Sequence, residues 1–378
     1  MKNVLLIIMV YFFFNSCKHD GLSDYENPRN FNEIFELFWY KLNNRYVYWD
    51  KDPTNWDMVY AKYKPLFDRL DDSDVSKRKA VGYFKEITGS LIDGHFNILF
   101  HDKVIRDSVI FPSINRKNKI AGFHDRYNYD DVVKNYLDAG FFGGKGSINI
   151  NGELINSLAG TINKNILYFH CNFFALKKSY QLNDGNKVQE ALAFFFSKLK
   201  NINGQTKGII LDLRNNTGGN IEDLNFIGGK LINRDTVFGF SRSKNGIEKY
   251  GYFPWIEAKL KSDPQYNVNV PIIILGDIFS ASLSETFIIA LRSKNNLFIG
   301  EQTYGATGPV SDSSIFNSGS FDVGDFLTVT SSSVEFIGAN GEFYESKGIT
   351  PDIISPFNYK RLSEGKDTQL ELAISRFN

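Results

Sequence analysis

Short apolar runs alternate with amphipathic segments in the second half of the chain, and this pattern limits the fold more than any other feature. Residues 208–213 and 270–275 are apolar at nearly every position, whereas 186–200 and 284–292 have the composition and length of helices. A strand that is apolar on both sides must be covered on both faces, as in parallel sheets whose crossover helices lie above and below them. The sequence therefore predicts an α/β fold with a parallel or mixed sheet.

Residues 29–100 follow a helical pattern instead. Phe31, Phe35 and Phe38 recur at spacings that place them on one face of a helix. Asn55 and Ser73 stand where helix-capping residues are expected, before two further helical segments. Three of the four tryptophans lie here, at Trp39, Trp49 and Trp56. We expect a small all-helical domain that precedes the α/β core.

The remaining boundaries are set by weaker signals. Residues 101–157 show little periodicity and are expected to connect the helical domain to a core at 158–378. The glycine-rich run 140–146 predicts a loop. Near the C-terminus, 341–354 reads as β structure.

The N-terminus reads as an export signal. Lys2 precedes an unbroken apolar run at 4–14, which is too short for a transmembrane helix of about 20 residues. The sequence before Cys17 resembles a bacterial lipobox, so we expect residues 1–17 to be a lipoprotein-type signal with Cys17 as the lipidated residue. Residues 18–28 then form a polar linker. An ordinary cleaved signal and an uncleaved anchor are the alternatives.

Charge and ligand-forming residues exclude several function classes. The 378 residues contain 43 Lys+Arg and 43 Asp+Glu, so no net field would steer a nucleic acid to the protein. Two cysteines and five histidines lack the spacing of a zinc site, and we expect neither a metal nor a cofactor. If Cys17 is lipidated, Cys171 has no partner and is expected to be a buried thiol in a strand.

Four polar segments could carry chemistry, although each is weak alone. The turn at 212–219 has consecutive glycines after a predicted strand, and such glycines can aim backbone N–H groups into a cleft. Serines at 280–285 stand between a strand and a helix, where a helix N-terminus could stabilise an oxyanion. The other two are 93–95 (Asp-Gly-His) and 342–352, which contains a glutamate beside a turn.

Taken together, these segments resemble the C-terminal-processing (tail-specific) serine peptidase family. The resemblance rests on D-L-R-N-N-x-G-G at 212–219, S-A-S-x-S-E at 280–285, G-E-x-T-Y-G at 300–305 and E-x-x-G-I-x-P-D at 345–352, in the family's order, with D-G-H upstream at 93–95. It implies a ClpP/crotonase-like core and a serine-type peptidase activity.

The resemblance also selects a branch of the family. The better-known branch uses a Ser-Lys dyad, but here Gly305 is followed by Ala306, so the dyad lysine is missing. The branch similar to the tricorn core protease uses a histidine and a glutamate, and His95 and Glu345 match those positions. The serine that precedes the histidine in the tricorn tetrad is replaced by Gly94.

The resemblance implies roles for individual residues. Ser282 would be the nucleophile, with Ser280 as the second candidate, and His95 would accept its proton. Glu345 would assist, whereas Asp212 and Arg214 are expected to hold the glycine turn. The oxyanion hole would come from backbone N–H groups of Gly219 or Gly218 and of Leu283.

The expected function is that of an exported, lipid-anchored serine endopeptidase. It would face the periplasm or the cell surface and hydrolyse polypeptides. No PDZ carboxylate-binding loop is evident in 101–157, so recognition of free C-termini is not implied. A catalytically inactive peptide- or lipid-binding module on the same fold is the main alternative, and hydrolysis or acyl transfer on a non-peptide substrate is a third.

Overall fold

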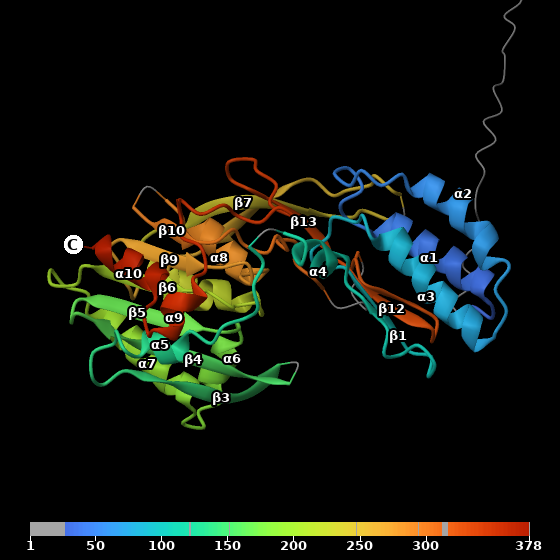
Figure 1. The fold of residues 1–378 in the computed structure, drawn as a ribbon. Coiled ribbons are helices and arrows are strands. Elements are labelled where there is room, and N and C mark those ends of the chain that lie inside the picture. The colour runs from blue at the N-terminus through green and yellow to red at the C-terminus, as the bar shows by residue number, and fades with distance from the viewer. Residues whose placement is uncertain are drawn as a thin grey trace, which may run out of the picture.

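The chain forms an α/β lobe that carries the C-terminus and a helical lobe at the opposite end (Figure 1). The computed structural model describes residues 27–120, 122–150, 152–246, 248–293, 295–311 and 317–377. The expected α/β fold with a helical N-terminal region is confirmed.

A seven-stranded mixed sheet forms the centre of the α/β lobe. Its strand order is β14-β10-β9-β6-β5-β4-β3, and the five strands from β14 to β5 run parallel. β3 and β4 complete one edge in antiparallel fashion. The strands are β3 (Phe142–Ile150), β4 (Glu153–Ile162), β5 (Ile166–Cys171), β6 (Gly208–Asp212), β9 (Ile272–Gly276), β10 (Leu297–Gly300) and β14 (Ile353–Ile354).

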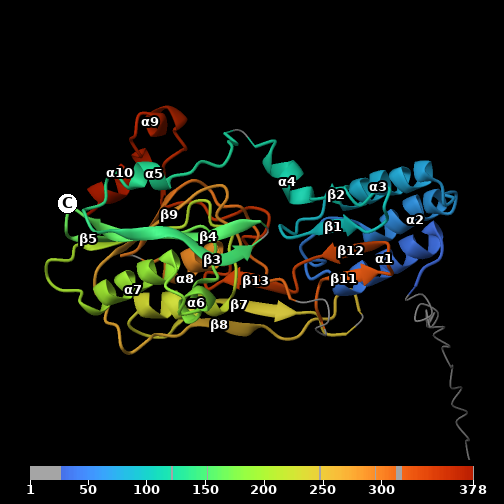
Figure 2. The ribbon, with the colours of Figure 1, turned by 90° about the horizontal axis from the view of Figure 1, so that it is seen from below.

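Helices cover both faces of this sheet, as Figure 2 shows. In β5, Phe169 and Cys171 pack toward α7 and α8, while Ile166 and Tyr168 pack toward α5 and α10. This double burial explains the apolar strands, and it confirms Cys171 as a buried thiol in a strand. The covering helices are α6 (Leu176–Gln181), α7 (Lys187–Lys200) and α8 (Leu283–Leu291) on one face, and α5 (Asp130–Val133), α9 (Tyr359–Ser363) and α10 (Thr368–Ser375) on the other.

Three capped helices build the other lobe. The side chains of Asn30, Asn55 and Ser73 accept hydrogen bonds from backbone N–H groups of the first turn, which satisfies donors that have no partner within a helix. The aromatic side chains of this lobe stack on one another; Trp39 and Trp56 also exchange indole-to-carbonyl hydrogen bonds. The helices are α1 (Phe31–Arg45), α2 (Trp56–Phe67) and α3 (Asp74–Thr88).

A small sheet adds strands to the helical lobe from a distant part of the chain. Its order is β11-β12-β1-β2. Phe321, Val323, Leu327 and Val329 are buried in the same apolar cluster as the helices. The helical lobe is therefore completed by a hairpin that lies in sequence between β10 and β14 of the central sheet. The strands are β1 (Asn97–Phe100), β2 (Val109–Ile110), β11 (Phe321–Val323) and β12 (Leu327–Thr330).

The last elements lie between or beside the two lobes. A three-stranded sheet has the order β13-β7-β8, with β7 (Thr236–Ser243), β8 (Ile256–Leu260) and β13 (Val334–Gly338). α4 (Pro112–Lys117) follows β2, and a π-helical turn (Leu224–Gly228) and a 3-10 turn (Gly229–Leu231) follow β6.

Two local expectations from the sequence are wrong. The run 140–146, expected as a loop, lies largely in β3, because its glycines let the strand approach its neighbours closely. A Cβ on Gly143 would lie 2.6 Å from Leu158 Cδ1, and one on Gly146 would lie 2.8 Å from Val188 Cγ2. The sheet thus begins before residue 158.

The second wrong expectation concerns residues 341–354. They form turns, and only β14 is a strand. The backbone of this segment bonds to the loop after β10 instead, as in Ser346 N–H to Gly305 O at 2.8 Å and Thr303 N–H to Ile349 O at 3.2 Å.

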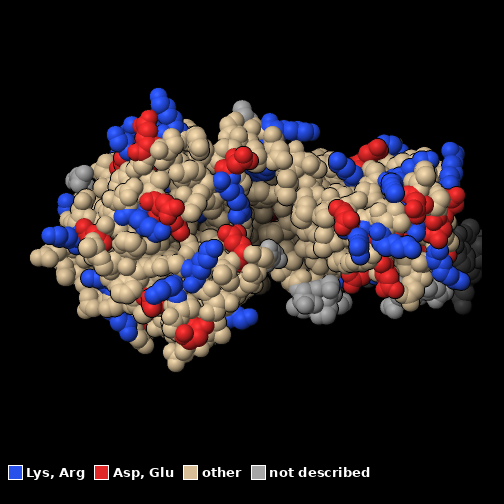
Figure 3. Space-filling model, turned by 60° about the horizontal axis from the view of Figure 1, so that its bottom comes forward, with Lys and Arg blue, Asp and Glu red and all other residues tan. Residues whose placement is uncertain are grey.

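Charged side chains of both signs are interspersed on the face drawn in Figure 3. That surface fits the zero formal charge and offers no broad basic patch. Among the described residues, no helix combines the length and apolarity needed to cross a bilayer.

Candidate active site

The parallel strands bring the polar segments to one edge of the sheet. The turns that follow β6, β9 and β10 all leave from carboxyl ends of neighbouring parallel strands. Ligands of open α/β sheets bind at such an edge. Two hydrogen bonds join the turn after β10 to the turn after β9: Glu301 N–H to Gly276 O at 3.0 Å and Tyr304 N–H to Ser280 O at 2.9 Å.

The turn between β9 and α8 separates three serines into different roles. Ser280 is buried and donates to Leu213 O at 2.7 Å, and Ser284 is buried and donates to the Asn216 side chain at 2.7 Å. Ser282 is partly exposed, and its hydroxyl donates no hydrogen bond to any described residue. Its backbone has φ +57° and ψ −119°, a conformation that L-residues adopt only when the surroundings impose it. Ser282 is thus the serine with an available hydroxyl.

The glycine turn after β6 lies against Ser282. Gly218 and Gly219 have φ +99° and +141°, and a Cβ on Gly218 would lie 2.6 Å from Ser282 Cβ. Gly218 N–H is already donated to Asn216 Oδ1 at 2.8 Å. In contrast, the N–H groups of Gly219 and Leu283 have no acceptor in the described part of the chain. Of the two glycines, Gly219 has the available donor.

Asn216 connects the two turns, and it was not singled out from the sequence. Its backbone carbonyl accepts from Ala281 N–H at 3.1 Å, and its side-chain oxygen accepts from Gly218 N–H and the Ser284 hydroxyl. Its amide nitrogen donates to Cys171 O at 2.8 Å. The only signal for this role was its place inside the 212–219 segment.

Asp212 and Arg214 hold the glycine turn after β6 in place, in agreement with the role expected for them. Both are buried, and Arg214 Nη2 lies 2.5 Å from Asp212 Oδ2. Arg214 Nη1 also lies 2.8 Å from Asp367 Oδ2, at the start of α10. The ion pairs tie the turn to a helix on the opposite face.

Glu285 fixes the backbone around Ser282. Its buried carboxylate accepts from Ser282 N–H at 3.1 Å, Gly305 N–H at 2.7 Å and Ala306 N–H at 2.8 Å, as well as from the Thr303 hydroxyl. Burial raises the pKa of Glu285, and these donors oppose the rise. The carboxylate thus accepts from the backbone of Ser282 and from the loop 303–306, so it organises the site rather than reacts in it.

Glu345 occupies the far side of the same loop. Its buried carboxylate accepts from Gly94 N–H at 2.6 Å, Thr307 N–H at 2.7 Å and Gly308 N–H at 3.0 Å. Burial, with the nearby Asp93 carboxylate, raises the pKa of Glu345 to about 8. This glutamate therefore supports the segment that carries His95 without touching the imidazole through a hydrogen bond.

His95 is held by two residues that sequence reasoning did not assign. Asp93 Oδ1 accepts from His95 N–H at 2.9 Å and from the Ser332 hydroxyl at 2.8 Å. Ser332 Oγ also lies 3.5 Å from His95 Nδ1, the outer limit of a hydrogen bond. When Ser332 donates to Asp93, it can accept only from a protonated Nδ1, which leaves Nε2 as the basic nitrogen. Burial lowers the pKa of His95, and the Asp93 carboxylate opposes that effect.

Gly94 has no room for a side chain. A Cβ there would lie 2.5 Å from Gly305 O and 2.6 Å from Ala306 Cβ. The serine of the tricorn tetrad could not occupy this position without a backbone shift. Ser332 instead supplies the hydroxyl next to the histidine, from a segment far away in sequence.

The loop 303–308 lies between the two halves of the site. Glu285, from the Ser282 side, binds its first part, and Glu345, from the His95 side, binds its second part. No hydrogen bond joins Ser282 to His95 among the residues that the structure describes. The segments of Ser282 and His95 therefore both bind the loop 303–308, but the two side chains are not hydrogen-bonded to each other.

Asp93, His95 and Glu345 could in principle bind a metal ion, since their ligand atoms lie within 4.8 Å of one another. The carboxylates, however, already accept four hydrogen bonds each from N–H and O–H donors. These donors stabilise the negative charge of the carboxylates, as a bound metal ion otherwise would. The arrangement therefore fits proton transfer better than metal binding.

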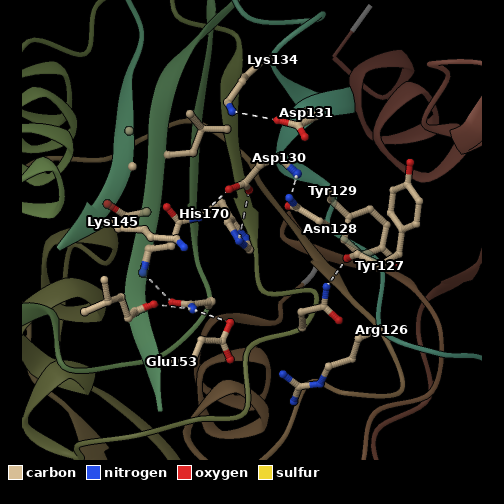
Figure 4. A pocket seen from close by; sticks show the side chains of 18 residues that line it. Arg126, Tyr127, Asn128, Tyr129, Asp130, Asp131, Lys134, Lys145, Glu153 and His170 are labelled. Carbon is tan, nitrogen blue, oxygen red and sulfur yellow. Dashed lines mark hydrogen bonds and ion pairs between the residues drawn. The ribbon is translucent and has the colours of Figure 1, made fainter. Parts of the chain in front are cut away.

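A polar pocket of about 610 Å³ opens beyond the glycine turn (Figure 4). Asn215 from that turn donates to Tyr127 O, and His170 faces Asp130 at 3.7 Å. His170 Nδ1 lies 2.9 Å from Asp212 O, which as a carbonyl can only accept. The lining of this pocket contains charged side chains of both signs. The pocket therefore has no evident preference for an anion or a cation.

Comparison with known proteins agrees with this geometry. Residues 165–355, just over half of the chain, match peptidase family S41. The chain belongs to peptidase family S41. The matched range contains both turns, Ser282 and Glu345, whereas His95 lies before it.

One curated relative matches a limited part of the chain. The carboxy-terminal processing protease CtpA of Bacillus subtilis (strain 168) is 29% identical over 148 residues, which are 39% of this chain and 28% of that protein. The match thus spans little more than a quarter of the relative's length.

Solved structures show the same fold over most of the chain. A protein of Parabacteroides merdae ATCC 43184, described as a candidate peptidase, is 19% identical with a TM-score of 0.70, covering 93% of this chain and 97% of that one. The tricorn protease is 15% identical with a TM-score of 0.50, covering 92% of this chain and 36% of that one.

Proposed function

We propose that this chain is a serine endopeptidase in which Ser282 is the nucleophile and His95 the general base. The observation that carries the proposal is the selective freedom of Ser282. Among the three serines of 280–285 it alone is partly exposed, strained and free to donate its proton. A strained turn that presents a serine in front of a helix N-terminus is a common arrangement for an acyl-transfer nucleophile.

The proton transfers follow from the polarity of the site. Ser282 would attack the scissile carbonyl while His95 Nε2 takes its proton, and the imidazolium would return that proton to the leaving amine. Ser332 and Asp93 would stabilise the imidazolium through Nδ1. The lowered pKa of His95 keeps the imidazole neutral before attack. The oxyanion would accept from the N–H groups of Gly219 and Leu283, and loss of one such donor typically costs about 10²–10³ in rate.

A fluorophosphonate probe tests the nucleophile directly. We expect the purified protein, without residues 1–17, to be labelled at Ser282 and to cleave an unfolded protein. Ser282→Ala should abolish both, whereas Ser363→Ala, an exposed serine on α9, should change neither. Full activity in Ser282→Ala would contradict the assignment.

A binding module without catalysis is the second candidate, because no hydrogen bond joins Ser282 to His95 in the described residues. Catalytic hydrogen bonds of ligand-free enzymes often tighten only when substrate binds. Peptide binding by a protein that the probe never labels would favour the module over the peptidase.

We also propose that the protein is exported and held at a bacterial membrane by a lipid on Cys17. Residues 1–17, including Cys17, lie outside the described residues, and the proposal rests on their sequence. Metabolic labelling with a radioactive fatty acid should mark the wild-type protein and fail in Cys17→Ser. An unlabelled wild type would contradict the anchor.

A further inference from the structure

A hollow of about 480 Å³ lies beside the candidate nucleophile turn. Ile278 of that turn lines it, together with Thr303 and Ser346. Thr303 bonds to Glu285, and Ser346 N–H bonds to Gly305 O at 2.8 Å, so the wall of the hollow continues into the loop that organises the active site. The hollow therefore borders the loop that is joined to the turn of Ser282 by the hydrogen bond from Tyr304 N–H to Ser280 O.

About half of the residues that line the hollow are apolar, and some of that apolar surface is exposed. Ile120, Phe123 and Ile354 are 54%, 38% and 68% exposed, respectively. Apolar side chains that gather around a concave site mark a binding surface more often than scattered ones do. The apolar lining residues are Ile120, Phe123, Ile278, Ile354, Pro356 and Phe357.

Two lysines give the hollow a positive charge. Among the described residues, no carboxylate forms an ion pair with Lys117 or Lys347, and both line the hollow. Lys117 is partly buried, with its ammonium 5.4 Å from the Tyr304 ring centre and 3.4 Å from Thr303 O. The one carboxylate in the lining, Glu301, is already bound to His124 at 2.9 Å and to Phe357 N–H at 3.2 Å.

We propose that this hollow selects polypeptide substrates in which an apolar side chain stands next to a carboxylate. The apolar side chain would enter between Ile278, Phe123 and Ile354. The carboxylate would pair with Lys117 and Lys347, and it could be an Asp or Glu side chain or a chain terminus. The proposal rests on the proposed function, because it places the substrate at Ser282.

Partial burial of Lys117 fits this role. Burial lowers its pKa, and the carboxylates of Glu285 and Glu345 oppose that effect. A bound carboxylate would raise the pKa again, because an opposite charge favours the protonated form. An unpaired, partly buried cation is costly to the free protein, and a substrate anion would offset that cost.

Binding measured on Ser282→Ala tests the hollow without cleavage. Fluorescent peptides would end in a Leu-Glu pair, a Leu-Gln pair or a Ser-Glu pair, each with an amidated or a free C-terminus. We expect the Leu-Glu peptide to bind several-fold more tightly than the amidated Leu-Gln peptide, which lacks the ion pair. It should bind about tenfold more tightly than the amidated Ser-Glu peptide, which lacks the apolar side chain. If a free terminus restores the affinity of Leu-Gln, the terminus also serves as the carboxylate.

Variants of the hollow provide the matched comparison. Lys347→Gln, and Lys117→Met with Lys347→Gln, should remove the preference for Leu-Glu over Leu-Gln. Ile354→Asp should weaken every Leu peptide. Lys79→Gln, an exposed lysine on α3, should change nothing. Equal binding of Leu-Glu and Leu-Gln, or an unchanged preference in the double variant, would overturn the proposal.

The two proposals fail in different ways. Selective binding with no cleavage by the wild-type protein would remove the peptidase function and leave the hollow as a binding site. Cleavage at Ser282 with no preference among the peptides would keep the peptidase and remove the hollow.

Discussion

At the scale of single residues, Gly94 departs from the tricorn-like motif, and the Ser332 hydroxyl lies beside His95 instead. The sequence revealed that the tetrad serine is missing, but it could not reveal that a Cβ would meet Gly305 and Ala306 or that Ser332 supplies a hydroxyl instead. Ser332 is 237 residues from His95, and no local pattern encodes such a contact.

Restoring the motif serine should therefore damage the protein. Gly94→Ser forces a side chain against the 305–306 backbone, and overpacking of this kind costs about 1–3 kcal/mol. Chemical unfolding would measure the loss, and peptidase activity should fall with it. Gly82→Ala is the matched control, since a Cβ on Gly82 in α3 meets nothing within 4 Å; it should stabilise by about 0.5–1 kcal/mol. An unaltered or raised stability in Gly94→Ser would show that the loop yields easily.

The environment of His95 predicts the acid limb of the pH profile. Burial lowers its pKa from 6.5, so His95 loses its proton, and activity appears, at a pH below that value. The midpoint of kcat/KM against pH should accordingly lie under 6.5, and His101→Gln, an exposed histidine, should leave it unchanged. A midpoint above 6.5 would mean that His95 is stabilised in its charged form or is not the base.

Glu345 should make the folded protein less stable as the pH rises. Its folded pKa, about 8, is above the ordinary value of 4.5. The stability that this group contributes is complete below pH 4.5 and is lost as the pH rises through about 8. Glu345→Gln cannot ionise, so the wild type should lose more stability than the variant between pH 5 and pH 9. Parallel unfolding curves across that range would contradict the raised pKa.

At the scale of elements, the glycine turn is joined to a helix on the other face of the sheet. The sequence placed Asp212 and Arg214 in a structural role, because they flank the turn. It could not place Asp367, which lies in a different part of the chain and completes the ion pairs. The motif was recognisable from the sequence, whereas the bonding role of Asn216 within it and the contribution of Asp367 depend on tertiary packing.

Arg214→Met should destabilise the whole α/β lobe. It leaves the buried carboxylates of Asp212 and Asp367 without their cation, and breaking a buried pair in this way costs about 3–5 kcal/mol. Arg361→Met is the control, because its pair with Glu364 is exposed and should cost less than about 1 kcal/mol. Thermal unfolding followed by circular dichroism would compare them; equal effects would show that the buried pairs contribute little.

At the scale of the whole molecule, the chain crosses between its lobes more than once. The helical pattern of 29–100 was readable because it is local. The hairpin β11–β12 that completes that lobe was not assigned to it, because short strands near the C-terminus carry no sign of their partner. The loop 303–308 and the segment from Ser331 to Glu345 then connect the hairpin back to the active site. The site depends on both lobes, since His95 follows the helices and Ser282 lies in the turn between β9 and α8 of the α/β lobe.

Because the hairpin β11–β12 packs against the N-terminal helices, we expect a substitution of a buried hairpin residue to destabilise those helices. Leu327→Ala removes a fully buried side chain from the cluster that contains α1 and α3, and such changes cost about 2–5 kcal/mol. Tryptophan fluorescence reports mainly on the helical lobe, where Trp39, Trp49 and Trp56 lie, so its denaturation midpoint should shift markedly. Leu99→Ala, in the same small sheet but 40% exposed, should shift it far less. If Leu327→Ala moved only the transition of the α/β lobe, the hairpin would not be part of the helical core, and the two lobes would fold independently.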